Sequence, residues 1–204
     1  MVSHISWVPR ELATQSGPTD HELVQHARDG SRQAQALLYS RYASPLAGLL
    51  VRLLGSRADA EDALHDTFLV AFEKLGALRE PAALYGWLQR VAVAQAHRRF
   101  RRARLRRLLG LEQTAPDAGL AELAARDASP EVRAELALID EQLRRSAPGT
   151  RTAWILRHVE GFELAEVARL CACSLATAKR RITVAEHSIR LHGPAQRDGE
   201  SGDA

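Results

Sequence analysis

Apolar residues recur along this chain at the three- and four-residue spacing of an α-helix, and glycine and proline divide the pattern into short segments. No run of alternating β-branched residues indicates a strand. These features predict an all-α fold. With 204 residues, of which 46 % are hydrophobic, the chain is long enough for two small helical domains, each with its own core.

The distribution of glycine, proline and small polar residues predicts where these domains lie. We expect a flexible N-terminal tail at residues 1–18 and a first helical domain at 19–107. A linker rich in Gly, Pro, Asp and Ala follows at 108–129. The second helical domain is expected at 130–191, and residues 192–204 have the composition of a disordered tail.

Capping signals divide the first domain into helices. Thr19 and Glu22 have the spacing of a capping box, which would start the first helix. A second helix is expected from Ser31 and a third from Pro45, since proline suits the first turn of a helix. The helices of this domain are expected to bury Ala34, Leu37, Leu38, Tyr42, Ala60, Leu64, Phe68, Ala71, Phe72, Leu75, Leu84, Leu88, Val91 or Ala92, Ala96 and Phe100.

The second domain has the length pattern of a helix-turn-helix. Gly161 ends one helix, residues 163–170 form a short one, 171–173 can turn, and Ser174 can cap the next helix. In this motif the last helix lies in the major groove of DNA and reads bases from its N-terminal part. That helix carries Thr177, Lys179, Arg180, Arg181, His187 and Arg190, which can donate to bases or phosphates. The alternative is an ordinary helical bundle with a basic exposed face.

Charge is distributed unevenly, although the formal net charge is only +3. Residues 59–73 hold five carboxylates and no Lys or Arg. Asp59, Asp62, Asp66 and Glu73 fall on one side of their helix, which commonly means only a solvated face. The same carboxylates could bind a divalent metal, but no second helix offers the Glu-x-x-His partner of di-metal bundles.

The stretch WLQRVAVAQAHRRFRRARLRR begins as an apolar helix and ends as a run of arginine. Between residues 90 and 107 there are eight arginines and no carboxylate. Such a run can lie on acidic lipid or bind phosphate. Nucleic acid is favoured because few apolar side chains accompany the arginines, whereas Tyr85, Trp87 and Phe100 offer aromatic surface to a base.

Cysteine usage and hydropathy point to a cytoplasmic protein. Cys171 and Cys173 are poorly spaced to bridge each other, and their spacing is not that of a zinc site. No apolar run approaches the roughly 18 residues of a membrane span, and the N-terminus lacks the pattern of a signal peptide. We expect no cofactor, no metal and no insertion into the membrane.

Four segments, taken in order, resemble the extracytoplasmic-function (ECF) type of bacterial RNA polymerase sigma factor. Together they cover roughly residues 20 to 190. HELVQHARDGSRQAQALLYSRY resembles the family's opening helices, and DAEDALHDTFLVAFEKL resembles its polymerase-binding helix. WLQRVAVAQAHRRFRR resembles its promoter-melting helix, and ILRHVEGFELAEVARLCACSLATAKRRI resembles its C-terminal helix-turn-helix. The order of the motifs, with a variable linker in the expected gap, makes the resemblance specific.

The resemblance implies three sets of site residues. Its polymerase-binding positions, which dock on a coiled-coil of the largest polymerase subunit, fall on Asp62, His65, Asp66 and Leu69. Its minus-ten positions fall on Leu78, Arg79, Tyr85, Trp87, Arg90, Arg98, Arg99, Arg101 and Arg102. Its minus-thirty-five positions fall on Ser174, Thr177, Lys179, Arg180, Arg181 and Thr183.

Several residues depart from the family's pattern. His65 stands where glutamine is usual, and Ala94 stands where asparagine is common. Arg98 replaces a frequent acidic residue, while Val184 and Glu186 replace commonly basic ones. The promoter sequences of relatives therefore do not transfer directly to this chain.

The resemblance implies a sigma factor with no catalytic activity of its own that makes core RNA polymerase promoter-specific. Its expected partners are core polymerase, double-stranded promoter DNA, the melted non-template strand and an anti-sigma factor. One alternative is a stand-alone helix-turn-helix regulator, for which the second domain would suffice. Another is an enzyme that uses the carboxylate helix with His65, although no nucleophile or phosphate loop accompanies that helix.

Overall fold

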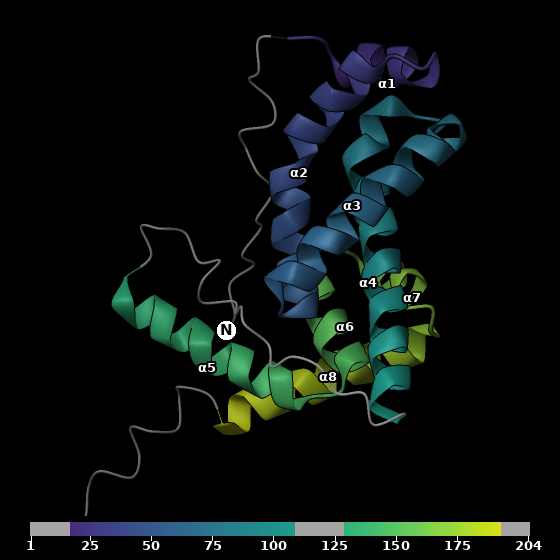
Figure 1. Cartoon of the computed structure of the whole chain (residues 1–204). Coiled ribbons are helices and arrows are strands. Elements are labelled where there is room, and N and C mark those ends of the chain that lie inside the picture. The colour runs from purple at the N-terminus through teal and green to yellow at the C-terminus, as the bar shows by residue number, and fades with distance from the viewer. Residues whose placement is uncertain (1–16, 109–128, 193–204) are drawn as a thin grey trace, which may run out of the picture. The chain divides into compact units, whose positions relative to one another are not determined.

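The computed structural model of the chain describes residues 17–108 and 129–192 (Figure 1). Within these ranges every regular element is a helix, as the periodicity predicts. The two ranges belong to separate compact units. Most of the expected linker at 108–129 and of the expected tails at 1–18 and 192–204 lies outside the described residues.

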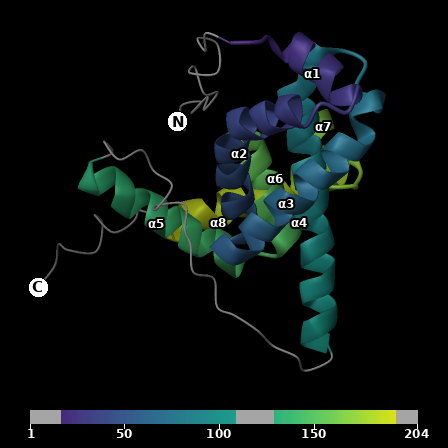
Figure 2. The same ribbon diagram turned by 45° about the horizontal axis from the view of Figure 1, so that its top comes forward.

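The first unit is built on three long helices that pack on one another. Its elements are α1 (Asp20–Arg28), α2 (Arg32–Leu54), α3 (Arg57–Lys74), the short 3-10 helices η2 (Leu75–Ala77) and η3 (Pro81–Ala83), and α4 (Leu84–Leu108). Helices α2, α3 and α4 contact one another, and α1 packs on α2. Their core includes Leu38, Leu46, Leu49, Leu50, Leu53, Ala60, Ala63, Phe68, Leu88, Ala92, Val93 and Ala96. Figure 2 shows the C-terminal part of α4 running on past the ends of α2 and α3.

Helix α2 differs from the prediction of two separate helices. It continues through Pro45, which lies inside the helix rather than in a first turn. An internal proline removes one backbone hydrogen bond and costs about 3 kcal/mol. Four leucines that follow it are fully buried, and each contributes about 1.5–3 kcal/mol, so packing outweighs the local cost; they are Leu46, Leu49, Leu50 and Leu53. Leu37 also departs from expectation: it is 41 % exposed, because the buried row of α2 runs through Ala34, Leu38 and Tyr42.

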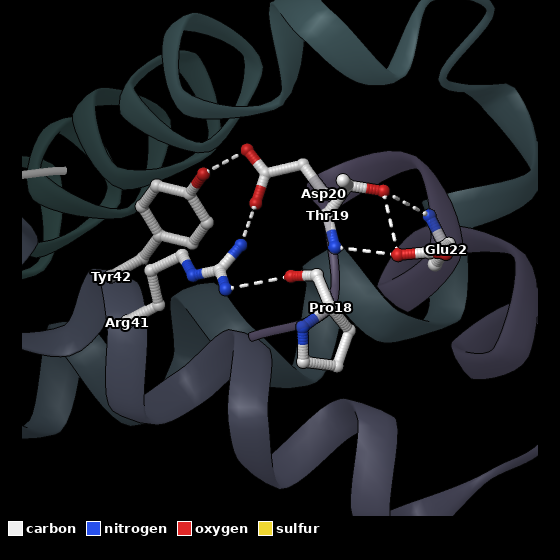
Figure 3. A network of polar contacts seen from close by, with 6 residues as sticks. All are labelled: Pro18, Thr19, Asp20, Glu22, Arg41 and Tyr42. Atoms are coloured by element: carbon white, nitrogen blue, oxygen red, sulfur yellow. Dashed lines mark hydrogen bonds and ion pairs between the residues drawn. The ribbon is translucent and has the colours of Figure 1, made fainter. Parts of the chain in front are cut away.

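Helix α1 is fastened to α2 by the polar network shown in Figure 3. The predicted capping box is present: the Thr19 amide donates to Glu22 Oε2 at 2.7 Å, and the Glu22 amide donates to Thr19 Oγ1 at 3.3 Å. Asp20 accepts from Arg41 Nη1 at 2.5 Å and from the Tyr42 hydroxyl. Burial and the hydrogen bond to Asp20 raise the pKa of Tyr42 far above its ordinary value of 10.0. Tyr42 therefore stays protonated and donates to Asp20 at neutral pH.

The second unit follows the predicted helix pattern. It contains α5 (Pro130–Arg145), α6 (Pro148–His158), α7 (Leu164–Leu170) and α8 (Leu175–His192). Gly161 follows α6 with φ of 74°, a backbone conformation that glycine adopts without strain. Helix α6 packs mainly on α8, while α7 and α5 pack against α8 from other directions. Their shared core includes Leu143, Ala153, Ile155, Leu156, Val167, Ala178, Ile182 and Ala185.

A buried ion cluster joins α5 to α6. Asp140 Oδ2 accepts from Arg144 Nε at 2.8 Å, and its Oδ1 accepts from Arg151 Nη2 at 3.0 Å. Asp140 and Arg151 are both buried. Because buried charges are stable only when they are paired, this cluster holds α5 against α6.

Candidate functional site

The residues expected to dock on polymerase form one strip on α3. Asp62, His65, Asp66 and Leu69 have the spacing of neighbours on a helix face. Asp62 and His65 are exposed, Asp66 is half-buried, and the Leu69 side chain is 56 % exposed. The opposite side of the helix buries Ala60, Ala63, Leu64, Phe68 and Ala71. The strip thus presents carboxylates, an imidazole and one apolar side chain together, a mixture suited to a protein partner.

Arg99 of α4 joins this strip. Its Nη1 lies 2.9 Å from Asp66 Oδ2, and its Nη2 lies 3.6 Å from Asp62 Oδ2. The Arg99 side chain is only 15 % exposed. The structure therefore places Arg99 among the α3 carboxylates, away from the exposed arginines of its own helix with which the sequence grouped it.

Helix α4 presents part of the expected basic surface with four other arginines. Arg90, Arg98, Arg101 and Arg102 are exposed, while Trp87 and Phe100 are half-buried. Arg90, Arg98 and Arg101 lie along one side of the helix, with the exposed Ala94 between the first two. A row of guanidiniums of this kind can bind successive phosphates and release counterions. The aromatic edges beside it can contact a base.

The segment that connects α3 to α4 is anchored by Arg28 of α1. Arg28 Nε donates to the Leu75 carbonyl at 3.3 Å, and Arg28 Nη2 donates to the Leu78 carbonyl. The Leu78 side chain is 5 % exposed, so its position does not support the expected contact with DNA. Arg79, the next residue, is exposed and accessible to a ligand.

Tyr85 lies at the start of α4 and is half-buried. Its ring stacks on that of Tyr42, with centroids 5.8 Å apart and planes 19° apart. Because Tyr42 is itself held by Asp20, the capped end of α1 supports an aromatic residue that the sequence assigned to DNA binding. Sequence reasoning placed Tyr42 in the core but missed this supporting role.

The second unit forms the predicted helix-turn-helix from α7, a turn and α8. Ser174 caps α8, with its Oγ accepting from the Thr177 amide at 3.2 Å. Ala172 in the turn has φ of 48°. On α8 the exposed candidates for DNA contact are Ser174, Lys179, Arg180 and Thr183, and Thr177 is half-buried.

Arg181 turns inward from α8 instead of projecting with these residues. A Cβ added at Gly149, in the first turn of α6, would lie 3.0 Å from Arg181 Cζ, so the guanidinium lies directly over that glycine. Burial raises the pKa of the Cys171 thiol in the turn to about 11, although the Arg181 charge acts to lower that pKa. Arg181 therefore links α6, the turn and α8, and it is not presented outward as the sequence predicted.

Glu186, one of the departures from the family pattern, has an internal partner. Its Oε1 lies 3.0 Å from His158 Nε2 on α6, and the His158 ring contacts Trp154 at a centroid distance of 5.1 Å. A carboxylate at this position thus braces α8 against α6. The pair was missed because the two residues are far apart in the chain and no local spacing indicates them.

The described residues hold neither a metal-binding cluster nor a membrane-spanning helix. Among residues 17–108 and 129–192, no three His, Cys, Asp or Glu side chains are grouped closely enough to hold a metal ion. In the same part of the chain, no helix is both long and apolar enough to cross a bilayer.

The chain is similar in sequence to known proteins over both units. The family model for sigma-70 region 2 matches residues 38–106. The RNA polymerase sigma-H factor of Pseudomonas aeruginosa is 31 % identical over 177 residues, which cover 83 % of this chain and 91 % of that protein. The ECF RNA polymerase sigma-E factor of Haemophilus influenzae is 32 % identical over 178 residues, covering 84 % and 93 %.

Solved structures share the fold. A sigma factor RpoE from Bartonella quintana, determined in complex with the anti-sigma factor NepR, has a TM-score of 0.58 and 21 % identity, covering 76 % of this chain and 94 % of that one. CnrH, determined with the cytosolic domain of CnrY, has a TM-score of 0.54 and 21 % identity, covering 89 % and 99 %. A stand-alone regulator would need only the second unit, yet the sequence relatives match more than four-fifths of the chain. The chain belongs to the ECF family of RNA polymerase sigma factors, which bind core polymerase and direct it to initiate transcription at promoters.

Proposed function

We propose that this protein docks on core RNA polymerase through the α3 strip of Asp62, His65, Asp66 and Leu69. The observation that supports this most strongly is the position of the strip: the residues that match the family's docking motif share one accessible side of one helix. Two carboxylates beside an exposed leucine suit a basic protein surface that also offers a small apolar contact. His65 supplies a donor and an acceptor where the family usually has glutamine.

Charge reversal tests this docking role. Replacing both Asp62 and Asp66 with lysine places like charges opposite the basic partner surface and should abolish association with core polymerase. Glu135 and Glu141 are exposed on α5 of the second unit, so replacing both with lysine makes the same change in net charge without altering α3. That control should bind core polymerase as the wild type does. Equal binding by both variants would reject the strip as the docking surface.

The exposed arginines of α4 carry the proposed contact with the minus-ten region. The phosphate backbone of the strand being opened would bind to Arg90, Arg98, Arg101 and Arg102. Arg79 would contribute a further contact to the same strand. Tyr85 and Trp87 would contact unstacked bases of the melted non-template strand. Replacing Arg98 and Arg101 with alanine should lower the salt slope of promoter binding by the holoenzyme by about two units. Lys74→Ala, which removes an exposed charge from the end of α3, should leave the slope unchanged.

Helix α8 carries the proposed contact with the minus-thirty-five element. Ser174, Thr177, Lys179, Arg180 and Thr183 lie on its first turns and are accessible or half-buried. Lysine and arginine there can donate to guanine edges, and each such contact is worth about 1–3 kcal/mol of discrimination. Arg180→Ala should therefore relax sequence preference at one or two base pairs of the upstream element in a promoter mutation scan. A uniform loss across all sequences would assign Arg180 to the phosphate backbone instead.

The protein as a whole would act in the cytoplasm as a specificity subunit with no catalytic activity of its own. By analogy with the sigma factor that was solved with the anti-sigma factor NepR, we expect an anti-sigma protein to hold it inactive. Reconstitution tests the function directly. Core polymerase plus this protein should start transcripts at a defined subset of promoters selected from genomic fragments, and the complete absence of transcripts would refute it.

A further inference from the structure

Arg99 has surroundings unlike those of its neighbours on α4. Arg98, Arg101 and Arg102 are exposed, and Arg98 Nη1 donates to Gln95 Oε1 of its own helix at 3.3 Å. Arg99 instead reaches across to α3, where it pairs with Asp66 at 2.9 Å and Asp62 at 3.6 Å. Because its side chain is only 15 % exposed, little of Arg99 is accessible to a phosphate outside α4.

The carboxylates on α3 keep an accessible side while they hold Arg99. Both pairs use Oδ2, which leaves Oδ1 of each carboxylate outside these contacts. Asp62 is 77 % exposed and Asp66 is 40 % exposed. A carboxylate can accept from several donors at once, so a basic group of a partner can bind either residue while Arg99 remains in place. Arg99 therefore shares these carboxylates with a partner and does not block them.

Arg99 also reduces the electrostatic repulsion between Asp62 and Asp66. Asp62 and Asp66 are four residues apart on one helix, a spacing at which like charges repel each other. The planar guanidinium presents donors in a fixed fork: Arg99 donates a hydrogen bond to Asp66 at 2.9 Å and attracts Asp62 as an ion pair at 3.6 Å. A lysine, which is a point charge on a flexible stem, cannot fix two acceptors in the same way.

We propose that Arg99 is a positioning residue of the polymerase-docking strip and is not a DNA contact. From α4 it fixes the orientation of the Asp62 and Asp66 carboxylates for basic side chains of core polymerase. The docking surface is then built by two helices, although the residues that touch polymerase lie on α3. This inference rests on the docking role proposed above for α3.

The test compares neighbouring arginines of the full-length protein. With Arg99→Ala the two carboxylates must be ordered when they bind, so affinity for core polymerase should fall by about three- to tenfold. Arg99→Lys should recover only part of that loss, and Arg98→Ala should bind core polymerase normally. In holoenzyme assembled with saturating core polymerase, the pattern should reverse: Arg98→Ala lowers the salt slope of promoter binding by about one unit, whereas Arg99→Ala leaves it unchanged.

Each outcome separates the inference from the proposed function. If Arg99→Ala binds core polymerase as tightly as the wild type, or more tightly, Arg99 does not position the carboxylates. If it lowers the salt slope, Arg99 is a DNA contact and the inference is wrong. Should Arg99→Ala fail to fold, the comparison is made with Arg99→Lys, for which normal core affinity would overturn the inference. Normal binding by the Asp62 and Asp66 charge-reversal variant would instead reject the docking role itself.

Discussion

The hydrogen bond between Tyr42 and Asp20 leads to a prediction in which the effect of one hydroxyl changes with pH. Tyr42→Phe removes the donor but keeps the ring that packs between α1 and Tyr85. A hydrogen bond to a charged acceptor contributes about 1.5–3 kcal/mol. The Asp20 side chain is 30 % exposed and can regain water, so we expect the low end of that range, about 1.5 kcal/mol, as the loss in the free energy of unfolding at pH 7.

This advantage of the wild type should disappear in alkaline solution. Burial and the bond to Asp20 raise the pKa of Tyr42 in the folded state, whereas the unfolded chain releases the same proton near 10.0. Above that pH the unfolded state binds fewer protons than the folded state, so the free energy of unfolding falls as pH rises. The loss reaches about 1.4 kcal/mol at pH 11. The Phe variant has no such proton, so the two proteins should be about equally stable at pH 11.

Urea titrations followed by the amide signals of α1 and α2 would measure both quantities in the first unit. Because the wild type and the variant are compared at the same pH, contributions from other titrating groups cancel. Tyr39→Phe is a matched control, since Tyr39 is 44 % exposed and packs its ring on Phe68. A stability gap that is the same at pH 7 and pH 11 would show that Asp20 and burial do not hold the Tyr42 proton.

The remaining predictions concern the second unit. Asp140→Asn should lower the free energy of unfolding of this unit by about 3 kcal/mol, because a buried carboxylate shared by two arginines loses its charge. Urea unfolding followed by signals from the second unit measures this loss. A loss below about 1 kcal/mol would contradict the prediction. Native protein at pH 7.5 should be alkylated at Cys173 and not at Cys171, whose burial raises its pKa to about 11. Peptide mass spectrometry distinguishes the two thiols, and equal labelling would show that Cys171 is accessible. Ser174→Ala should remove the cap of α8 and cost about 1 kcal/mol in thermal or urea unfolding, whereas an unchanged midpoint would mean that the cap bond does not form in solution.

Features that depend on nearby residues could be predicted from the sequence. The capping box at Thr19, the turn at Gly161 and the cap at Ser174 each involve residues only a few positions apart. The α3 strip was predictable for the same reason, since helical periodicity alone puts Asp62 and Asp66 on one side. Local spacing therefore specified several helix ends and the exposed side of α3.

Features that depend on distant partners could not be predicted. Tyr42 and Asp20 are 22 positions apart, and His158 and Glu186 are 28 positions apart, so no local pattern connects either pair. The unbroken path of α2 through Pro45 also depends on packing: the burial of the leucines that follow, against α3 and α4, decides it. In each case a tertiary contact overrides or supplements a local preference, and that contact can be known only once the helices are placed.

The arginines show most clearly why a count of charges is a poor guide to function in this protein. Arg98 and Arg99 are adjacent in α4, and Arg180 and Arg181 are adjacent in α8. The two side chains of each pair therefore point in directions about 100° apart around the helix axis. In both pairs the first arginine is exposed, while the second contacts another helix of its own unit. The inward arginine is held against a neighbouring helix, whereas the outward one is accessible to a phosphate or a base. Substituting the two members of a pair one at a time should therefore distinguish the loss of positioning from the loss of a DNA contact. Removing a whole basic run would cause both losses together.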